Sequence, residues 1–195
     1  MKKQTKKLVV FASGTGSNAL NIIKYFENNP HVKIEAVFCN NPKAKVLEKA
    51  KSENVNTFLF TKQELQNTDI VINKLKSLSP DLIVLAGFLL KIPEDIISIF
   101  KHKIINLHPA LLPKYGGKGM YGEHVHRAVL HNKEPETGIS IHLVNPIYDD
   151  GQILAQFKTP VDTDETLESL QDKIHTLEHQ HFPKVIDKLL KDGKA

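Results

Sequence analysis

The order of hydrophobic and polar positions predicts strands and helices that alternate through the first half of the chain. Leu8 to Ala12 is a continuous apolar run, as in the buried strands of parallel sheets. Asn18 to Asn28 instead repeats its apolar residues with the period of a helix. The same pattern predicts further strands at 34–39, 57–60, 81–86 and 104–107, and helices at 43–52, 63–78 and 94–100. Such alternation indicates an α/β fold, a Rossmann-like and mostly parallel sheet with helices on both faces.

The second half of the chain follows a different order. A helix is predicted at 123–131, followed by strands at 138–144 and 153–157 with a polar loop between them. Asp162 and Glu165 are spaced as a capping signal for a long last helix, predicted over 165–191. Neither repeats nor linkers interrupt these elements, and 195 residues suit one domain, 1–195.

Composition and charge narrow the class of protein. The apolar content of 41% is ordinary for a globular chain, and no apolar run approaches the ~20 residues of a membrane span. The single cysteine, Cys39, allows no internal disulfide and suits a reducing compartment. The net charge of +4 comes from scattered lysines, often beside glutamates, so a small anionic substrate explains it as well as nucleic acid does.

Candidate chemistry is concentrated at Asn106-Leu107-His108-Pro109. If the preceding strand continues to Leu107, side chains alternate, and Asn106 and His108 emerge on the same face. An amide donor would then lie beside an imidazole at a strand end, where open α/β sheets bind ligands. This pair could stabilise an oxyanion and transfer a proton. The alternative is a strand followed by a proline-stiffened loop with no catalytic role.

A glycine-rich loop follows the first predicted strand. Gly14 to Ala19 matches the G-x-G-x-x-A pattern in its strand–turn–helix context, which predicts a phosphate at the helix N-terminus. A dinucleotide site also needs an acidic residue at the end of the second strand, and that strand ends in Cys39-Asn40-Asn41. An NAD site is therefore disfavoured, and a tight turn that needs glycine for steric reasons is the other alternative.

The ten histidines raise the possibility of a metal site. His175 to His179 fits the H-x-x-E-H pattern of some zinc peptidases, but no supporting motif supplies a third ligand. A solvated helix face explains this segment better. His124 and His126 fit either surface positions or the lining of a pocket.

Taken together, these motifs resemble the folate-dependent formyltransferases over nearly the whole chain. The resemblance rests on the following segments: Ser13–Asn18, Val84–Phe88, Asn106–Tyr115, Gly138–His142 and Asp149–Gly151. It implies the formyltransferase fold and transfer of the formyl group of 10-formyltetrahydrofolate to the amine of 5′-phosphoribosylglycinamide (GAR), in de novo purine biosynthesis. It further implies a cytoplasmic enzyme, a monomer or homodimer, that needs no metal and has no nucleic-acid or membrane partner.

Residue roles also follow from the resemblance. The catalytic positions are Asn106, His108 and Asp149. The positions that bind GAR are Gly16, Ser17, Asn18, His175 and Glu178. The positions that bind the folate are Leu89, Leu90, Lys91, Ile92, Asn106, Asn145, Pro146, Ile147 and Tyr148.

Two segments depart from the family pattern. Gly116 to Gly122 is longer and richer in glycine, so the roles of Lys118 and Tyr121 stay open between a lid and a longer loop. Glu64, beside Lys62, stands where some relatives place an arginine near the folate.

Related activities offer alternatives to this function. A formyltetrahydrofolate deformylase or a methionyl-tRNA formyltransferase would share the fold, but each carries an additional domain for which we expect no room. A non-catalytic nucleotide-binding module would use the glycine loop alone, and it would have no need for the three catalytic positions together.

Overall fold

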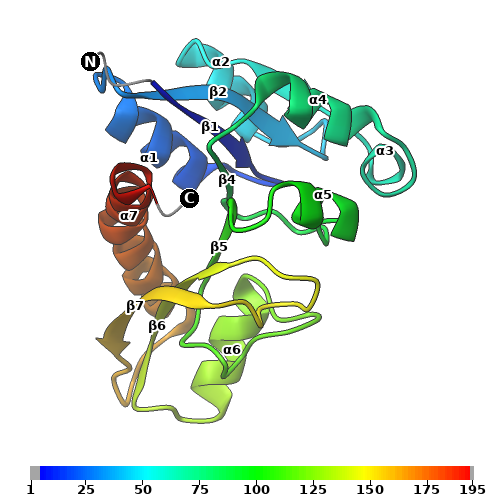
Figure 1. Ribbon diagram of the computed structural model, residues 1–195. Helices are drawn as coiled ribbons and strands as arrows, with labels where there is room; N and C mark the ends of the chain where they lie inside the picture. The colour runs from blue at the N-terminus through cyan, green and yellow to red at the C-terminus, as the bar shows by residue number, and fades with distance from the viewer. Residues whose placement is uncertain (1–4, 194–195) are drawn as a thin grey trace.

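The computed structural model describes residues 5–193 and is built on one twisted sheet (Figure 1). The strand order is β3-β2-β1-β4-β5-β6-β7. Strands β1 to β5 are mutually parallel, β6 runs antiparallel to β5, and β7 runs antiparallel to β6. The strands are β1 (Lys6–Phe11), β2 (Val32–Cys39), β3 (Thr57–Leu59), β4 (Leu82–Leu85), β5 (Ile104–His108), β6 (Glu136–Leu143) and β7 (Ile153–Pro160). The predicted mostly parallel α/β sheet is confirmed.

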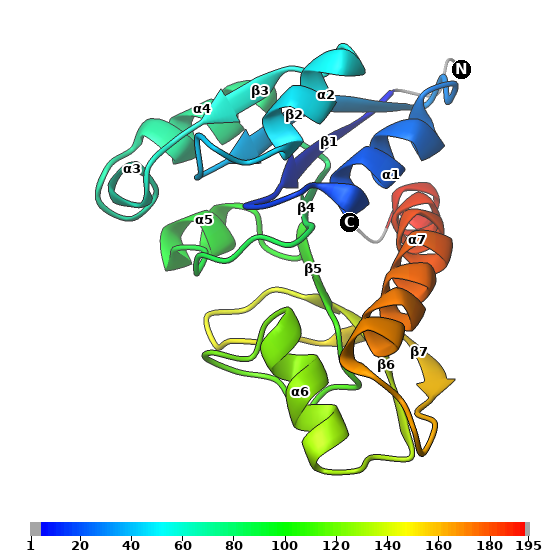
Figure 2. The ribbon, with the colours of Figure 1, turned by 180° about the vertical axis from the view of Figure 1, so that it is seen from behind.

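Helices cover both faces of the sheet because successive side chains of each buried strand point to opposite sides. Leu8 and Val10 pack with α1, α2 and α7 on one face, whereas Val9 and Phe11 pack with α3, α4 and α5 on the other. Figure 2 shows α7 running alongside α1. The helices are α1 (Ser17–Phe26), α2 (Val46–Ser52), α3 (Lys62–Asn67), α4 (Ile70–Leu78), α5 (Glu94–Ile99), α6 (Glu123–His131) and α7 (Leu167–Asp192).

The helix predicted over 63–78 is wrong as a single element, because α3 and α4 are separate. Thr68 has extended backbone angles, and its hydroxyl donates to the Glu64 carbonyl at 2.9 Å. The same oxygen accepts from the Ile70 N–H at 3.3 Å, at the start of α4. A side chain that bonds its neighbouring backbone in this way competes with continuous helix.

The start predicted for the last helix also differs from the structure. Thr166 is the N-cap of α7 and forms a capping box with Ser169. Asp162 and Glu165 instead form the turn before the helix, in which the Asp162 N–H donates to the Glu165 carboxylate at 3.2 Å. Lys173 pairs with both carboxylates and holds this turn against α7.

Ser140 fixes the proline-rich segment that follows β5. It is fully buried on β6, and its hydroxyl donates to the Ala110 carbonyl at 2.6 Å while accepting from the Leu112 N–H at 2.9 Å. Gln156 on β7 donates to the same hydroxyl at 2.8 Å and to the Leu112 carbonyl at 2.9 Å. The antiparallel half of the sheet therefore positions the loop that follows His108.

Within residues 5–193, no helix combines the length and the apolar character that crossing a bilayer requires.

Candidate active site

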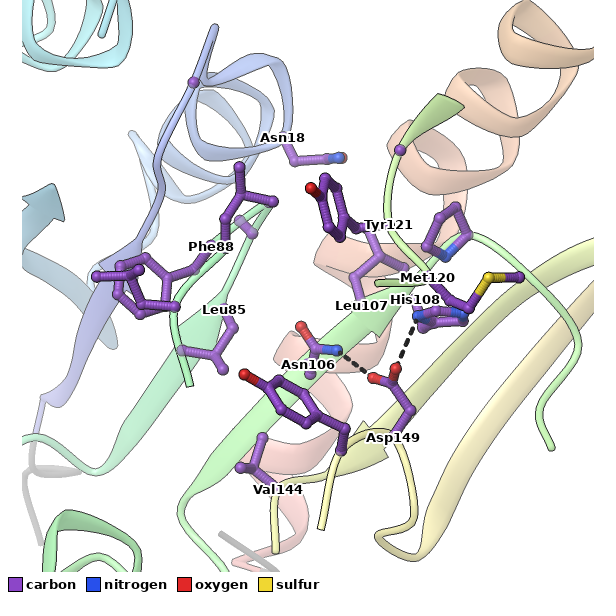
Figure 3. A pocket seen from close by; sticks show the side chains of 18 of the residues that line it. Asn18, Leu85, Phe88, Asn106, Leu107, His108, Met120, Tyr121, Val144 and Asp149 are labelled. Carbon is purple, nitrogen blue, oxygen red and sulfur yellow. Dashed lines mark hydrogen bonds and ion pairs between the residues drawn. The ribbon is translucent and has the colours of Figure 1, made fainter. Parts of the chain in front are cut away.

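A cavity of about 690 Å³ lies at the carboxyl ends of β1, β4 and β5 (Figure 3). The residues predicted for catalysis and for both substrates line this cavity, with Pro146 as the exception. Pro146 is exposed on the outer side of the turn in which the Asn145 side chain accepts from the Ile147 N–H at 2.9 Å. Asn145, Ile147 and Tyr148 from the same turn do line the cavity, so the contact predicted between Pro146 and the folate stays a prediction.

Asn106 lies near the end of β5, with its amide nitrogen between two acceptors. Its Nδ2 lies 3.1 Å from His142 Nε2 and 3.4 Å from Asp149 Oδ1. His142 Nδ1 lies 2.9 Å from the Leu143 carbonyl, which can only accept, so Nδ1 carries the proton and Nε2 accepts from Asn106. The contact to Asp149 is the longer one, and a substrate oxygen can replace it more readily.

His108 ends the same strand and is 3% exposed. Its Nε2 lies 2.7 Å from the Tyr115 carbonyl oxygen, so Nε2 carries a proton and donates. Its Nδ1 lies 3.5 Å from Asp149 Oδ2. Burial lowers the pKa of His108 below its ordinary value, whereas the Asp149 carboxylate and the Tyr115 carbonyl favour the charged form and nearby His142 disfavours it.

Asp149 reaches the end of β5 from the loop between β6 and β7. Its Oδ2 accepts from the Gly117 N–H at 2.9 Å, and its side chain is 11% exposed. Burial raises the pKa of this carboxyl, but the Gly117 N–H and the nearby rings of His142 and His108, in their charged forms, together hold it below its ordinary value. Asp149 is therefore an ionised carboxylate that accepts from the Asn106 amide and faces Nδ1 of His108, which donates to it when the ring is charged.

The glycine loop has the strand–turn–helix geometry that its sequence predicts. Gly16 is the N-cap of α1 in the left-handed region, with φ of 71°. A Cβ built on Gly16 would lie 2.3 Å from Val46 Cγ2 and 2.9 Å from Val46 Cα. Both the backbone conformation and the approach of α2 therefore require glycine there. Ser17 and Asn18 follow in the first turn of α1, on the rim of the cavity.

Asn18 and Glu178 join α1 to α7 across the cavity wall. The Asn18 amide donates to Glu178 Oε2 at 2.8 Å, and Asn18 Oδ1 is buried without a hydrogen-bond partner. Burial raises the pKa of Glu178, opposed by the Asn18 hydrogen bond and by the charge of His175. This wall therefore offers a ligand both an acceptor and a carboxylate inside a largely buried site.

The opposite wall is apolar and comes from the ends of β4 and β6. It includes Leu85, Phe88, Leu90, Ile92 and Val144. Ser13 ties this wall to the glycine loop, because its hydroxyl accepts from the Leu89 N–H at 3.0 Å.

Glu64 does not line the cavity. Its carboxylate accepts from the Thr61 N–H at 2.6 Å in the capping box of α3.

Several lining residues were absent from the predicted site. Figure 3 shows Met120 and Tyr121 projecting into the cavity from the 116–122 segment. His126 lies 5% exposed on α6, and its Nδ1 has no hydrogen-bond partner. Burial and nearby His175 lower its pKa to about 4. In the sequence, the only sign of these three residues was that they follow the Asn106–Pro109 motif closely. The fold is needed to show that their side chains face the cavity.

The His175–His179 segment contributes His175 and Glu178 to the wall of the cavity. Glu178 bonds to Asn18, and the rings of His175 and His179 lie nearly parallel, with centroids 6.4 Å apart. In the part of the chain that the structure describes, no group of three or more His, Cys, Asp or Glu side chains is arranged to hold a metal ion.

Comparison with known proteins agrees with this geometry. The profile of the family described as formyl transferase matches residues 6–186. The phosphoribosylglycinamide formyltransferase of Bacillus subtilis is 35% identical over 190 residues, which cover 95% of this chain and 95% of that protein. The Escherichia coli enzyme of the same name is 33% identical, over 92% of this chain and 84% of its own length.

A solved structure gives the same result for the fold. The phosphoribosylglycinamide formyltransferase of Anaplasma phagocytophilum superposes with a TM-score of 0.88 at 31% identity, covering 97% of this chain and 89% of that one. With the family profile, the sequence relatives and the fold in agreement, the chain belongs to the formyl transferase family.

Proposed function

We propose that this protein transfers the formyl group of 10-formyltetrahydrofolate to the amine of GAR, giving formyl-GAR and tetrahydrofolate. The observation that carries the proposal is the convergence of Asn106 and His108 on Asp149 at the cavity floor. The names of the full-length relatives support GAR as the acceptor.

In the proposed reaction the GAR amine attacks the formyl carbon and forms a tetrahedral intermediate with a developing oxyanion. Asn106 and His108 donate to that oxygen. Their contacts to Asp149, at 3.4 and 3.5 Å, are longer than good hydrogen bonds and leave both donors able to turn toward it. Donors arranged before the reaction stabilise the developing charge without having to reorient.

Proton movement in this reaction falls to His108 and Asp149. The attacking amine loses a proton as the carbon–nitrogen bond forms, and the leaving folate nitrogen gains one as its bond to the formyl carbon breaks. His108 can donate from Nδ1 only as the imidazolium, and the charge of ionised Asp149 favours that form against the burial that lowers the pKa of His108. A water molecule beside Asp149 would complete the transfer to the folate nitrogen.

The two substrates occupy opposite sides of this centre in the proposal. The phosphate of GAR binds at Gly16, Ser17 and Asn18, because a helix N-terminus with free N–H groups attracts anions. Glu178 and His175 contact the rest of GAR from α7. The folate ring lies against the apolar wall and the backbone of Leu89 to Ile92, with the 145–148 turn beside it.

The direct test follows the absorbance change as purified protein consumes 10-formyltetrahydrofolate, with GAR, without GAR, and with a chelator. We expect consumption that requires GAR and survives the chelator. Consumption of the donor without GAR would indicate a deformylase. No consumption in any arm would favour a non-catalytic nucleotide-binding module, and loss of activity with the chelator would indicate a metal enzyme.

A further inference from the structure

The backbone of Tyr115 contacts His108 in the proposed catalytic centre, and its side chain bonds to residues outside the cavity. Its carbonyl oxygen lies 2.7 Å from His108 Nε2. Its hydroxyl donates to Glu134 Oε1 at 2.8 Å and accepts from Asn132 Nδ2 at 2.9 Å. Glu134 and Asn132 lie in the connection between α6 and β6, so the phenol is tied outside the cavity.

The backbone of Tyr115 needs such an attachment. Its φ is 57°, in the left-handed region that costs a residue with a Cβ about 1 kcal/mol or more. The conformation directs the carbonyl inward at His108 while the ring points away. Without the bonds of the hydroxyl, less would hold the peptide in this orientation.

The two residues after Tyr115 link the same segment to Asp149. A Cβ added at Gly116 would lie 3.2 Å from Asp149 Cβ and 2.6 Å from Leu112 Cδ2, so the chain passes close to the carboxylate there. The Gly117 N–H then donates to Asp149 Oδ2 at 2.9 Å. Residues 115–117 therefore contact both partners of the His108–Asp149 pair.

From these contacts we propose that Tyr115 is a positioning residue, which fixes the ring and tautomer of His108 through its carbonyl and is itself held by Glu134 and Asn132. With Nε2 bound to this carbonyl, Nδ1 must be the nitrogen that faces Asp149 and the reacting atoms. The catalytic part of this inference rests on the proposed function; the placement of the imidazole does not.

The test compares Tyr115→Phe with Lys114→Gln. The first variant removes only the hydroxyl. The control removes the exposed ion pair from Lys114 Nζ to Glu134, at 2.9 Å, and leaves both bonds of the Tyr115 hydroxyl in place. Glu134→Ala is a second variant that should act in the same direction as Tyr115→Phe, because it removes the acceptor.

For Tyr115→Phe we expect kcat to fall about tenfold, which corresponds to about 1.4 kcal/mol, with KM for both substrates within about twofold of the wild type. The NMR titration of His108, assigned with His108→Gln, should move to lower pH, because a carbonyl acceptor favours the protonated ring. Asp149, His142 and His126 also act on this ring and are unchanged in the variant. Lys114→Gln should match the wild type in both measurements.

The titration needs no substrate, so it tests Tyr115 even if the wild type proves inactive with GAR. An unchanged His108 titration in Tyr115→Phe would overturn the inference, whatever happened to the melting temperature. Equal effects in Lys114→Gln would overturn it as well, since the loss would then come from the surface ion pair.

Discussion

The side-chain amide of Asn18 donates a 2.8 Å hydrogen bond to the Glu178 carboxylate, across 160 positions of sequence. The bond connects the first turn of α1 with the middle of α7, and these two helices lie side by side in both views (Figures 1 and 2). A carboxylate buried to this degree is unfavourable in the free protein unless a ligand or a donor compensates it. Asn18 supplies one such donor, and in the proposed function GAR supplies the rest of the compensation.

Glu178→Gln should separate these two effects. The amide keeps an acceptor for Asn18 but carries no charge, so we expect KM for GAR to rise about tenfold. Because burial raises the pKa of Glu178 in the folded state, its ionisation destabilises the fold as pH rises through that value. The variant should melt about 3 °C above the wild type at pH 8 and show no gain at pH 4. A variant that is less stable at pH 8 would contradict this.

His126→Gln should flatten the loss of stability in acid. The folded pKa of His126 is about 4, below the ~6.5 of an unfolded chain, so the unfolded state takes up the proton first and stability falls between these two values. Urea unfolding at pH 7.5 and 4.5 should show the variant losing about 2 kcal/mol less than the wild type. His131→Gln, at the exposed end of the same helix, is the matched control. Equal losses in all three proteins would rule out His126 as the source.

Gly16→Ala should disrupt the glycine loop, whereas Gly14→Ala should not. At Gly16 the new methyl group meets Val46 and the backbone has a positive φ, so we expect a loss of about 3 kcal/mol in unfolding free energy. At Gly14 a Cβ has no heavy atom within 4 Å, and the change should stay within about 0.5 kcal/mol. Similar losses at both positions would show that the loop is not held against α2 as described.

Asp149→Asn should lower kcat by about 100-fold or more, with smaller changes in KM. The variant removes the charge that favours the imidazolium of His108, so the His108 titration should also move to lower pH. Asp150→Asn is the control, because Asp150 is exposed and does not line the cavity, and its amide would still accept from Asn145 Nδ2, now 3.2 Å from Asp150 Oδ2. If Asp150→Asn lost as much kcat as Asp149→Asn, the role assigned to Asp149 would be wrong.

The sheet and two of the three proposed catalytic residues could be predicted from local patterns. The apolar runs of β1 and β4 and the period of α1 identify the parallel sheet without further information. Asn106 and His108 follow from strand alternation, since both belong to one strand and face one cavity. Residues two positions apart on a strand point to the same face, so this relationship can be read from the sequence alone.

Asp149 and Glu178 could not be derived in the same way. Asp149 reaches β5 only because β6 pairs with it antiparallel, with Asn106 opposite His142. Glu178 reaches Asn18 only because α7 packs on α1. The pairing of β5 with β6 and the packing of α7 on α1 depend on the whole core. These two residues were therefore predicted from the family resemblance and not from local pattern. Local pattern also failed at Thr68. The apolar period predicts a continuous helix there, but the hydrogen bond of the Thr68 side chain to the backbone ends it.

The most direct test of GAR as the acceptor uses 10-formyltetrahydrofolate labelled with carbon-13 in the formyl group, incubated with the protein and GAR, and followed by NMR. The proposed function predicts that the label moves from the folate into a formamide carbon on GAR, and that one tetrahydrofolate is released for each formyl-GAR formed. Label that appears as free formate, with GAR unchanged, would contradict it.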